Sequence, residues 1–138
     1  MKKYGIAAES YESVFPILQK RIDFDPENLL YQARANFAYT QLGRVYHLAS
    51  EYEKSKEAFE KALSISAKLL EKDPENPISM ESVAAAFEEY ANLLKKLDLS
   101  KEAEEYIAKA EALNEILKEE KMEEDKLEEE EKVYENDS

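Results

Sequence analysis

Apolar residues along the chain recur at intervals of three and four positions, which is the period of a helix with one buried face. One such stripe runs through Phe37, Leu42 and Tyr46, and the next runs through Phe59 and Leu69. Short polar or proline-containing segments separate the stripes, so each stripe is expected to form its own helix. The pattern predicts five helices, at about residues 4–23, 28–49, 51–72, 77–97 and 100–130.

The apolar pattern repeats after 48 residues without a gap. The aligned positions keep their size class, as repeated packing requires. Examples are Tyr39 with Phe87, Leu42 with Tyr90, Gly43 with Ala91, Phe59 with Ile107 and Ile65 with Leu113. A backward shift matches the start of the chain to the second half of a repeat. The predicted units are a half repeat at 1–26, repeats at 27–74 and 75–117, and an acidic segment at 118–138.

The tetrapeptide Asp-Pro-Glu-Asn occurs at residues 25–28 and again at 73–76. Proline cannot continue a helix and disfavours helical backbone in the residue before it, so each copy is expected to end a helix. Asn28 and Asn76 are suitable N-caps for the helices that follow, and Pro77 suits the first helical position. The same corner between helices is therefore expected twice.

The other helix starts are less clear. Ser50 and Glu53 have the spacing of a capping box, in which each side chain bonds the other's backbone N–H. Asp98 or Ser100 is expected to cap the last helix. Pro16 lies inside the first helical stripe, so it is expected to kink that helix or to mark its start.

Composition agrees with a helical chain, because there are only two glycines and four prolines. The absence of cysteine excludes disulfides and zinc-thiolate sites, and an intracellular, cytoplasmic location is expected. No apolar run has a signal peptide's length or the ~20 residues of a membrane span, so no membrane association is expected.

The formal net charge of −13 is concentrated at the C-terminal end of the chain. Residues 98–138 carry 6 basic and 17 acidic side chains, whereas residues 1–97 carry 13 and 15. A field of this sign repels phosphate backbones, so the chain is not expected to bind nucleic acid.

The residues at the helix contacts resemble the tetratricopeptide repeat. The first full unit carries Tyr39-x2-Leu42-Gly43-x2-Tyr46, then Ser55-x3-Phe59-x2-Ala62, and closes with Asp73-Pro74. The resemblance implies antiparallel helical hairpins stacked as a right-handed α-solenoid of about five helices, with small residues where helices approach closely. Two departures are the 48-residue period, against the usual 34, and a last repeat without Asp-Pro.

The same resemblance implies a non-enzymatic scaffold that binds a protein or peptide segment in a concave groove lined by the first helix of each pair. The groove positions that it carries over are Phe37, Thr40, Arg44, His47, Ala85, Glu88, Asn92 and Lys95. The carboxylate clamp of chaperone-binding members is matched only at Asn92, so chaperone tails are not the expected partner.

No pattern of residues indicates catalysis, and no cofactor or metal is expected. His47 is the only histidine, which excludes the two-histidine metal motifs. Core packing is expected for Tyr39, Tyr46, Tyr90 and Tyr106.

Self-association as a homodimer is the alternative function. The unpaired first helix would present an apolar face carrying Tyr11, Val14, Ile17 and Leu18, which another subunit could cover. A fragment of a longer tetratricopeptide protein, whose preceding helix covers that face, is the other reading.

Residues 118–138 hold 4 lysines and 11 acidic residues, and their few larger apolar residues are Met122, Leu127, Val133 and Tyr134. This apolar content is too sparse for a coiled-coil seam. The segment is expected to extend the last helix into solvent and then fray into disorder, with an acidic partner-binding tail as the alternative.

Overall fold

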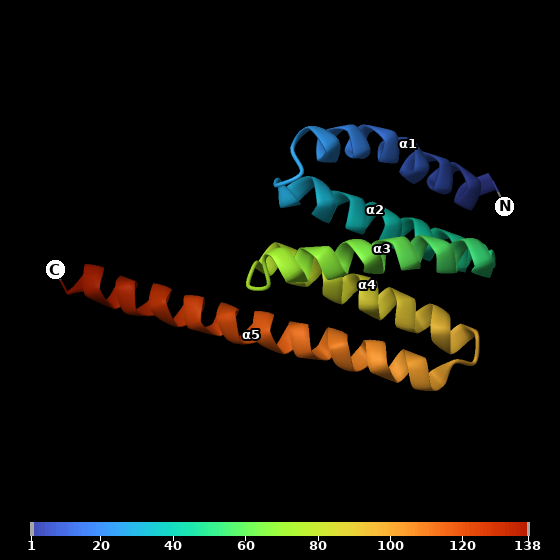
Figure 1. The fold of residues 1–138 in the computed structure, drawn as a ribbon. Helices are drawn as coiled ribbons and strands as arrows, with labels where there is room; N and C mark the ends of the chain where they lie inside the picture. The colour runs from blue at the N-terminus through green and yellow to red at the C-terminus, as the bar shows by residue number, and fades with distance from the viewer. Residues whose placement is uncertain (1, 138) are drawn as a thin grey trace.

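The computed structural model describes residues 2–137, and this part of the chain is built from five helices without strands (Figure 1). The helices are α1 (Lys2–Phe24), α2 (Leu29–Leu48), α3 (Tyr52–Lys72), α4 (Pro77–Lys96) and α5 (Ser100–Asn136). The all-α prediction is confirmed. Residues 1 and 138, the outer limits of the predicted segments 1–26 and 118–138, lie outside the described residues.

Each helix packs against the next one along the chain, and α2 also packs against α4. No Cα atoms of α1 and α3, or of α3 and α5, come within 8 Å of each other. The helices therefore form two layers, with α2 and α4 in contact in one layer and α1, α3 and α5 spaced apart in the other.

A hydrophobic core cluster forms where α3, α4 and α5 meet around Phe59, which is fully buried. A Cβ atom on Gly43 would lie 2.7 Å from the Phe59 ring, so α2 and α3 approach too closely there for a side chain. Ser55 Oγ donates a hydrogen bond to the Gly43 carbonyl across 2.6 Å. Ala91 and Ala103 are fully buried between α4 and α5. The expectation of small residues at close helix contacts is confirmed.

Both Asp-Pro-Glu-Asn segments form the expected corners. The side chain of Asn28 accepts a hydrogen bond from the Leu30 N–H, at 3.1 Å, and Asn76 accepts one from the Ile78 N–H, at 3.0 Å. Pro77 is the first residue of α4. Both N-cap predictions are confirmed.

The predicted capping box at Ser50 is wrong. Ser50 and Asp98 both have left-handed backbone, with φ of 60° and 59°. They follow the C-termini of α2 and α4. After α2, Ser50 N–H donates to the His47 carbonyl and Glu51 N–H donates to the Tyr46 carbonyl; after α4, Asp98 N–H donates to the Lys95 carbonyl and Leu99 N–H donates to the Leu94 carbonyl. Each of these two pairs of bonds is a Schellman motif. These residues therefore end helices. Neither α3 nor α5 has a side-chain N-cap bond, so capping by Asp98 or Ser100 is also wrong.

The predicted core tyrosines differ in depth. Tyr90 is buried, whereas Tyr39, Tyr46 and Tyr106 are half-buried. Pro16 lies inside α1, which begins well before it, so Pro16 does not mark the start of that helix.

Asn36 is a buried polar residue that the sequence pattern does not predict. Its amide donates hydrogen bonds to the Ala62 carbonyl at 2.7 Å and to Ser66 Oγ at 2.6 Å, which ties α2 to α3. Its Oδ1 atom has no hydrogen-bond partner among the described residues.

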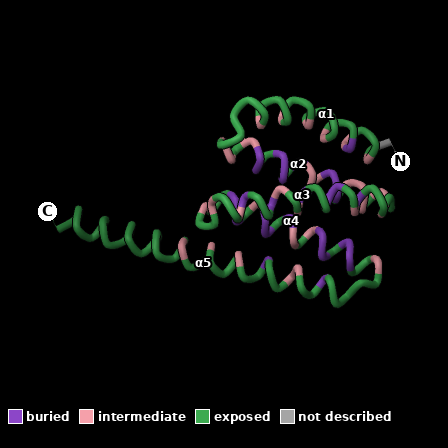
Figure 2. Tube along the Cα trace, in the orientation of Figure 1, coloured by how far each residue is buried: buried purple, intermediate pink, exposed green. Residues whose placement is uncertain are grey.

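The C-terminal part of α5 leaves the body of the molecule. Its buried residues are Ala103 and Ala110, and every residue from 121 to 137 is exposed (Figure 2). The segment is helical to Asn136, beyond the expected end of the last helix at about residue 130. In the described chain, no helix has the length and apolar character needed to cross a bilayer.

Candidate interaction surfaces

The residues predicted to line a groove on α2 and α4 are only partly available. Phe37 is 55% exposed and Arg44 is also exposed, and their seven-residue spacing puts them on one side of α2. On α4, Ala85, Asn92 and Lys95 are exposed. Because α2 and α4 are in contact, these side chains belong to neighbouring helices. We call these five residues the α2–α4 face.

Three other predicted groove residues have different surroundings. Thr40 is only 2% exposed and its hydroxyl donates to the Asn36 carbonyl at 2.8 Å, so its assignment to a ligand-binding surface is wrong. His47 is half-buried with its ring edge-on to Tyr52. Glu88 is exposed but accepts a hydrogen bond from Asn114 Nδ2 at 2.8 Å, which links it to α5.

A cleft of about 920 Å³ opens between α1 and α3, because no Cα atoms of these two helices come within 8 Å of each other. We call it the α1–α3 cleft. Its floor is formed by α2, its α1 wall is largely apolar but includes Glu12 and Gln19, and its α3 wall carries three lysines and Ile65. The lining includes Phe15, Leu18 and Ile22 from α1, Gln32, Ala35, Tyr39 and Leu42 from α2, and Lys61, Ile65, Lys68 and Lys72 from α3.

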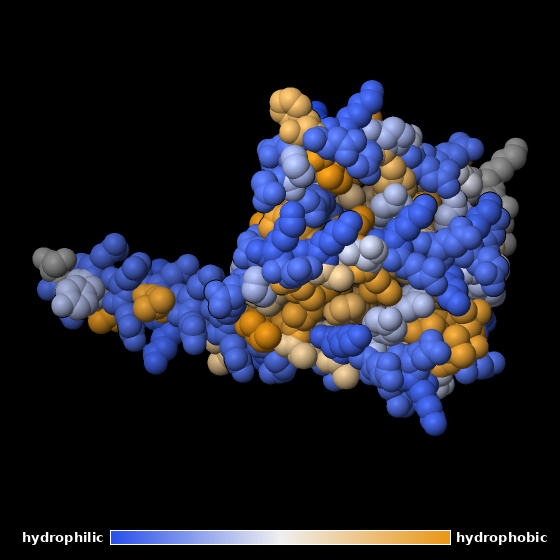
Figure 3. All heavy atoms as spheres, viewed as in Figure 1, coloured by the Kyte–Doolittle hydropathy of each residue, from blue (hydrophilic) through white to orange (hydrophobic). Residues whose placement is uncertain are grey.

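A second cleft, of about 510 Å³, lies between α3 and α5 over the side chain of Phe87. We call it the α3–α5 cleft. Hydrophobic surface is visible between these helices in Figure 3. Its lining consists of Leu63, Ala67, Leu70, Phe87, Tyr106, Lys109, Ala112 and Leu113.

The two clefts are copies of each other under the 48-residue repeat. Adding 48 to Phe15, Gln19, Ile22, Tyr39, Lys61 and Ile65 gives Leu63, Ala67, Leu70, Phe87, Lys109 and Leu113. Each floor carries an aromatic ring with a lysine over it: Lys61 Nζ lies 5.6 Å from the Tyr39 ring centroid, and Lys109 Nζ lies 5.9 Å from that of Phe87. Both distances suit a cation–π contact.

Sequence reasoning missed these clefts although it aligned several of their residues. Tyr39 and Phe87 were aligned as equivalent repeat positions, and Tyr39 was expected to lie in the core. The missed signal is the lysine that follows each aromatic by 22 residues, at 61 and 109. Lysine at equivalent repeat positions beside an aromatic residue indicates a repeated surface feature, since lysine is rarely fully buried.

The α1–α3 cleft has a basic rim. Lys61, Lys68 and Lys72 are exposed along α3, and no carboxylate side chain of residues 3–137 lies within 4.0 Å of their ammonium groups. The α3–α5 cleft has only Lys109. The two copies therefore share lining positions and differ in size and charge.

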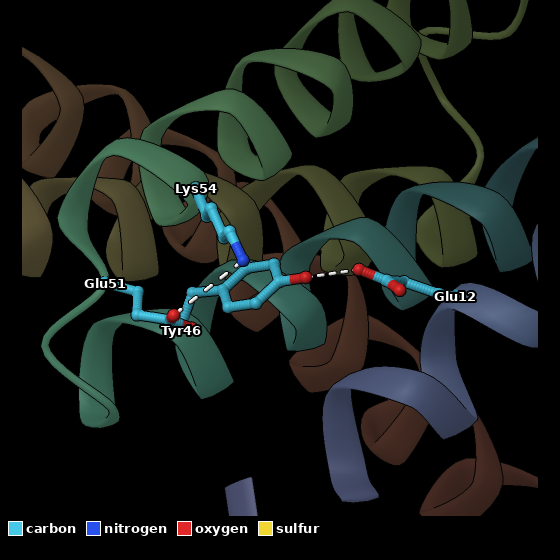
Figure 4. A network of polar contacts seen from close by, with 4 residues as sticks. All are labelled: Glu12, Tyr46, Glu51 and Lys54. Atoms are coloured by element: carbon cyan, nitrogen blue, oxygen red, sulfur yellow. Dashed lines mark hydrogen bonds and ion pairs between the residues drawn. The ribbon is translucent and has the colours of Figure 1, made fainter. Parts of the chain in front are cut away.

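A polar cluster ties α1 to α2 at one end of the α1–α3 cleft (Figure 4). The Tyr46 hydroxyl donates a short hydrogen bond to Glu12. Lys54 Nζ lies 5.6 Å from the centroid of the Tyr46 ring and 3.7 Å from a carboxylate oxygen of Glu51. Partial burial, followed by the bond to Glu12 and the charges of Glu12 and Glu51, raises the pKa of Tyr46 to about 12.

The remaining titratable groups with perturbed pKa belong to the core. Burial raises the pKa of Tyr90, with smaller effects from Tyr106 and Glu60, and burial also raises the pKa of Tyr106. Their rings pack edge to face with centroids 4.9 Å apart. In the described part of the chain, no cluster of three or more His, Cys, Asp or Glu side chains is arranged to hold a metal ion.

Comparisons with protein-family models, with curated proteins and with solved structures found no match. The resemblance to the tetratricopeptide repeat therefore depends on the residues quoted above.

Proposed function

We propose that this chain is a non-enzymatic helical-repeat scaffold of the tetratricopeptide type, stacked as a right-handed solenoid, that binds polypeptide segments. Support for the architecture comes from the repeat motif, the packing of consecutive helices and the additional contact between α2 and α4. Gly43, Ser55, Ala91 and Ala103 occupy the close contacts that the motif requires.

The observation that carries the functional proposal is the recurrence of a cleft lined by residues at equivalent positions of the 48-residue repeat. Both clefts lie on the side of α1, α3 and α5, whereas the resemblance places its concave groove on the first helices, α2 and α4. A solenoid presents equivalent surfaces along its length, and extended chains or amphipathic helices bind to such surfaces. The apolar floors suit the side chains of a bound segment, and a lysine beside each floor suits a segment with acidic residues.

The α2–α4 face is the second candidate for the binding surface, because Phe37 is a large exposed aromatic residue next to a charged one on the same side of α2. Exposed aromatic and arginine side chains are frequent at energetically important interface positions. The proposed location is the cytoplasm, in keeping with a chain without cysteine. Nucleic acid is disfavoured as a partner by the net charge of −13.

Affinity capture with quantitative mass spectrometry, using lysate of the source organism, tests the proposal and separates the two surfaces. The cleft variant combines Lys61→Glu with Lys109→Glu, and the face variant combines Phe37→Ser with Arg44→Glu. Lys96→Glu combined with Lys101→Glu, two exposed positions outside both surfaces, is the control matched in net charge to the cleft variant. Circular dichroism verifies that each variant is folded.

Loss of a specific protein from the cleft variant, with retention by the face variant and the control, is the expected result. Loss from the face variant alone would move binding to α2 and α4. A chain that retains no specific protein in any form would refute the scaffold.

A further inference from the structure

The C-terminal extension of α5 carries an apolar stripe that nothing in the described structure covers. Ile116, Leu127 and Tyr134 are 44%, 60% and 84% exposed. They are separated by 11 and 7 residues, which returns a helix to within about 20° of the same direction. Glu123 lies in the same direction between Ile116 and Leu127, so the apolar positions on this side of the strongly charged helix are interrupted by a charged one.

Acidic side chains border this stripe. Glu124 and Glu131, three residues before and four after Leu127, lie along one flank of it, and Glu130 lies along the other. The whole segment 118–138 has 11 acidic residues and 4 lysines. The extension is thus an acidic helix with a few exposed apolar residues on one side.

The α1–α3 cleft has the opposite character. It has an apolar floor at Tyr39 and Leu42, and the exposed lysines 61, 68 and 72 follow one wall without carboxylate partners among residues 3–137. Complementary charge of this kind steers association and fixes the register of a bound helix. The α3–α5 cleft, with a single lysine and about 510 Å³, offers less charge and less space.

The spacing of the charged residues along the two helices also agrees. The spacing of seven residues between Lys61 and Lys68 equals that between Glu124 and Glu131. Two helices lying side by side can therefore pair these charges at both positions.

The extension cannot reach the cleft of its own chain. α5 runs without interruption from Ser100 to Asn136, and its extension projects away from the other helices, whereas α1 is separated from α5 by the three intervening helices (Figure 1). Docking within one chain would require a break in a continuous helix. The extension of a second copy has no such restriction.

We propose that the α1–α3 cleft binds the acidic extension of α5 from a second copy of this chain, with the apolar stripe on the cleft floor and its glutamates against the lysines of α3. This inference rests on the proposed function, because it names the polypeptide that one of the two clefts takes.

Charge exchange tests it in the full-length chain by sedimentation velocity over a concentration series at low and high salt. One variant carries Lys61→Glu, Lys68→Glu and Lys72→Glu, and the other carries Glu124→Lys, Glu128→Lys and Glu131→Lys. A control with Lys3→Glu, Lys96→Glu and Lys101→Glu has the same change in net charge as the first variant, at exposed positions outside the cleft and outside the α2–α4 face. Circular dichroism melting verifies the fold of each.

The unmodified chain and the control are expected to associate, and their association should weaken as salt is added. Each charge-reversed variant alone should associate with an affinity lower by at least about tenfold. Mixing the two charge-reversed variants should restore the association. The proposal is overturned if the unmodified chain stays monomeric throughout the series, or if the cleft variant associates as well as the control does. It is also overturned if the mixture fails to recover.

Affinity capture from lysate with the same variants distinguishes failure of the self-association proposal from failure of the proposed scaffold function. A monomeric chain that still retains a specific protein, and loses it when the lysines of the cleft are reversed, leaves the scaffold standing without self-association. A monomeric chain that retains nothing removes both.

Discussion

Replacing Gly43 with alanine tests the close approach of α2 and α3 that organises the core. The added Cβ would lie 2.7, 2.7 and 2.8 Å from three carbon atoms of the Phe59 ring. Comfortable carbon–carbon contacts are about 3.5–4.0 Å, so the ring or the helix must move by about 1 Å. Phe59 is fully buried and has no free space to move into.

The magnitude follows from two opposing effects. Overpacking of a core costs about 1–3 kcal/mol, and alanine in a helix interior gains about 0.5–1 kcal/mol over glycine. Gly43→Ala should therefore lower the free energy of unfolding by about 1–2 kcal/mol. Gly5→Ala is the matched control, since a Cβ there would meet nothing within 4 Å, and it should raise the free energy of unfolding by about 0.5–1 kcal/mol.

Urea denaturation followed by circular dichroism measures both variants. Combining Gly43→Ala with Phe59→Leu should cost less than the sum of the two single changes, because the smaller side chain removes the clash. If Gly43→Ala is as stabilising as Gly5→Ala, the close packing of Phe59 on Gly43 is not present in solution.

Three further predictions concern single contacts. Ser50→Gly and Asp98→Gly should each stabilise the chain by about 0.5–1 kcal/mol, measured by thermal melting, because both residues have left-handed backbone that glycine adopts without strain; a loss of stability would contradict the Schellman geometry. Tyr46 keeps its proton up to about pH 12 in the folded chain and loses it near pH 10 when unfolded, so the free energy of unfolding should fall between pH 10 and pH 12. The fall should be smaller in Tyr46→Phe and in Glu12→Gln, and equal pH profiles of the original chain and these variants would exclude the Glu12 contact. Asn36→Ala should cost about 1–3 kcal/mol in urea denaturation because it removes two buried hydrogen bonds, and a neutral effect would mean that the bonds are absent.

The parts of the fold that local chemistry determines could be predicted from the sequence. Each Asp-Pro-Glu-Asn corner needs only proline to stop one helix and asparagine to cap the next, and both corners formed as expected. The helix ends after α2 and α4 were not predicted, because left-handed backbone is uncommon for serine and aspartate. The spacing of Ser50 and Glu53 favoured a capping box instead.

The candidate site depended on how helices are placed relative to one another, which the stripes do not reveal. Thr40 was assigned to an open face, but α2 packs against α4 as well as α3, and Thr40 is buried. The clefts arise because α1 and α3, and α3 and α5, stay apart. Only tertiary geometry shows that spacing, although the repeated lysines 61 and 109 were visible in the sequence.

Lysine footprinting is the most direct test of binding in the clefts. The chain is acetylated alone and in the presence of the polypeptide it captures, and the modification of each lysine is quantified by mass spectrometry. Protection of Lys61, Lys68 or Lys109, with Lys95 and Lys101 still reactive, is the result that cleft binding predicts. Protection of Lys95 without protection of any cleft lysine would contradict it.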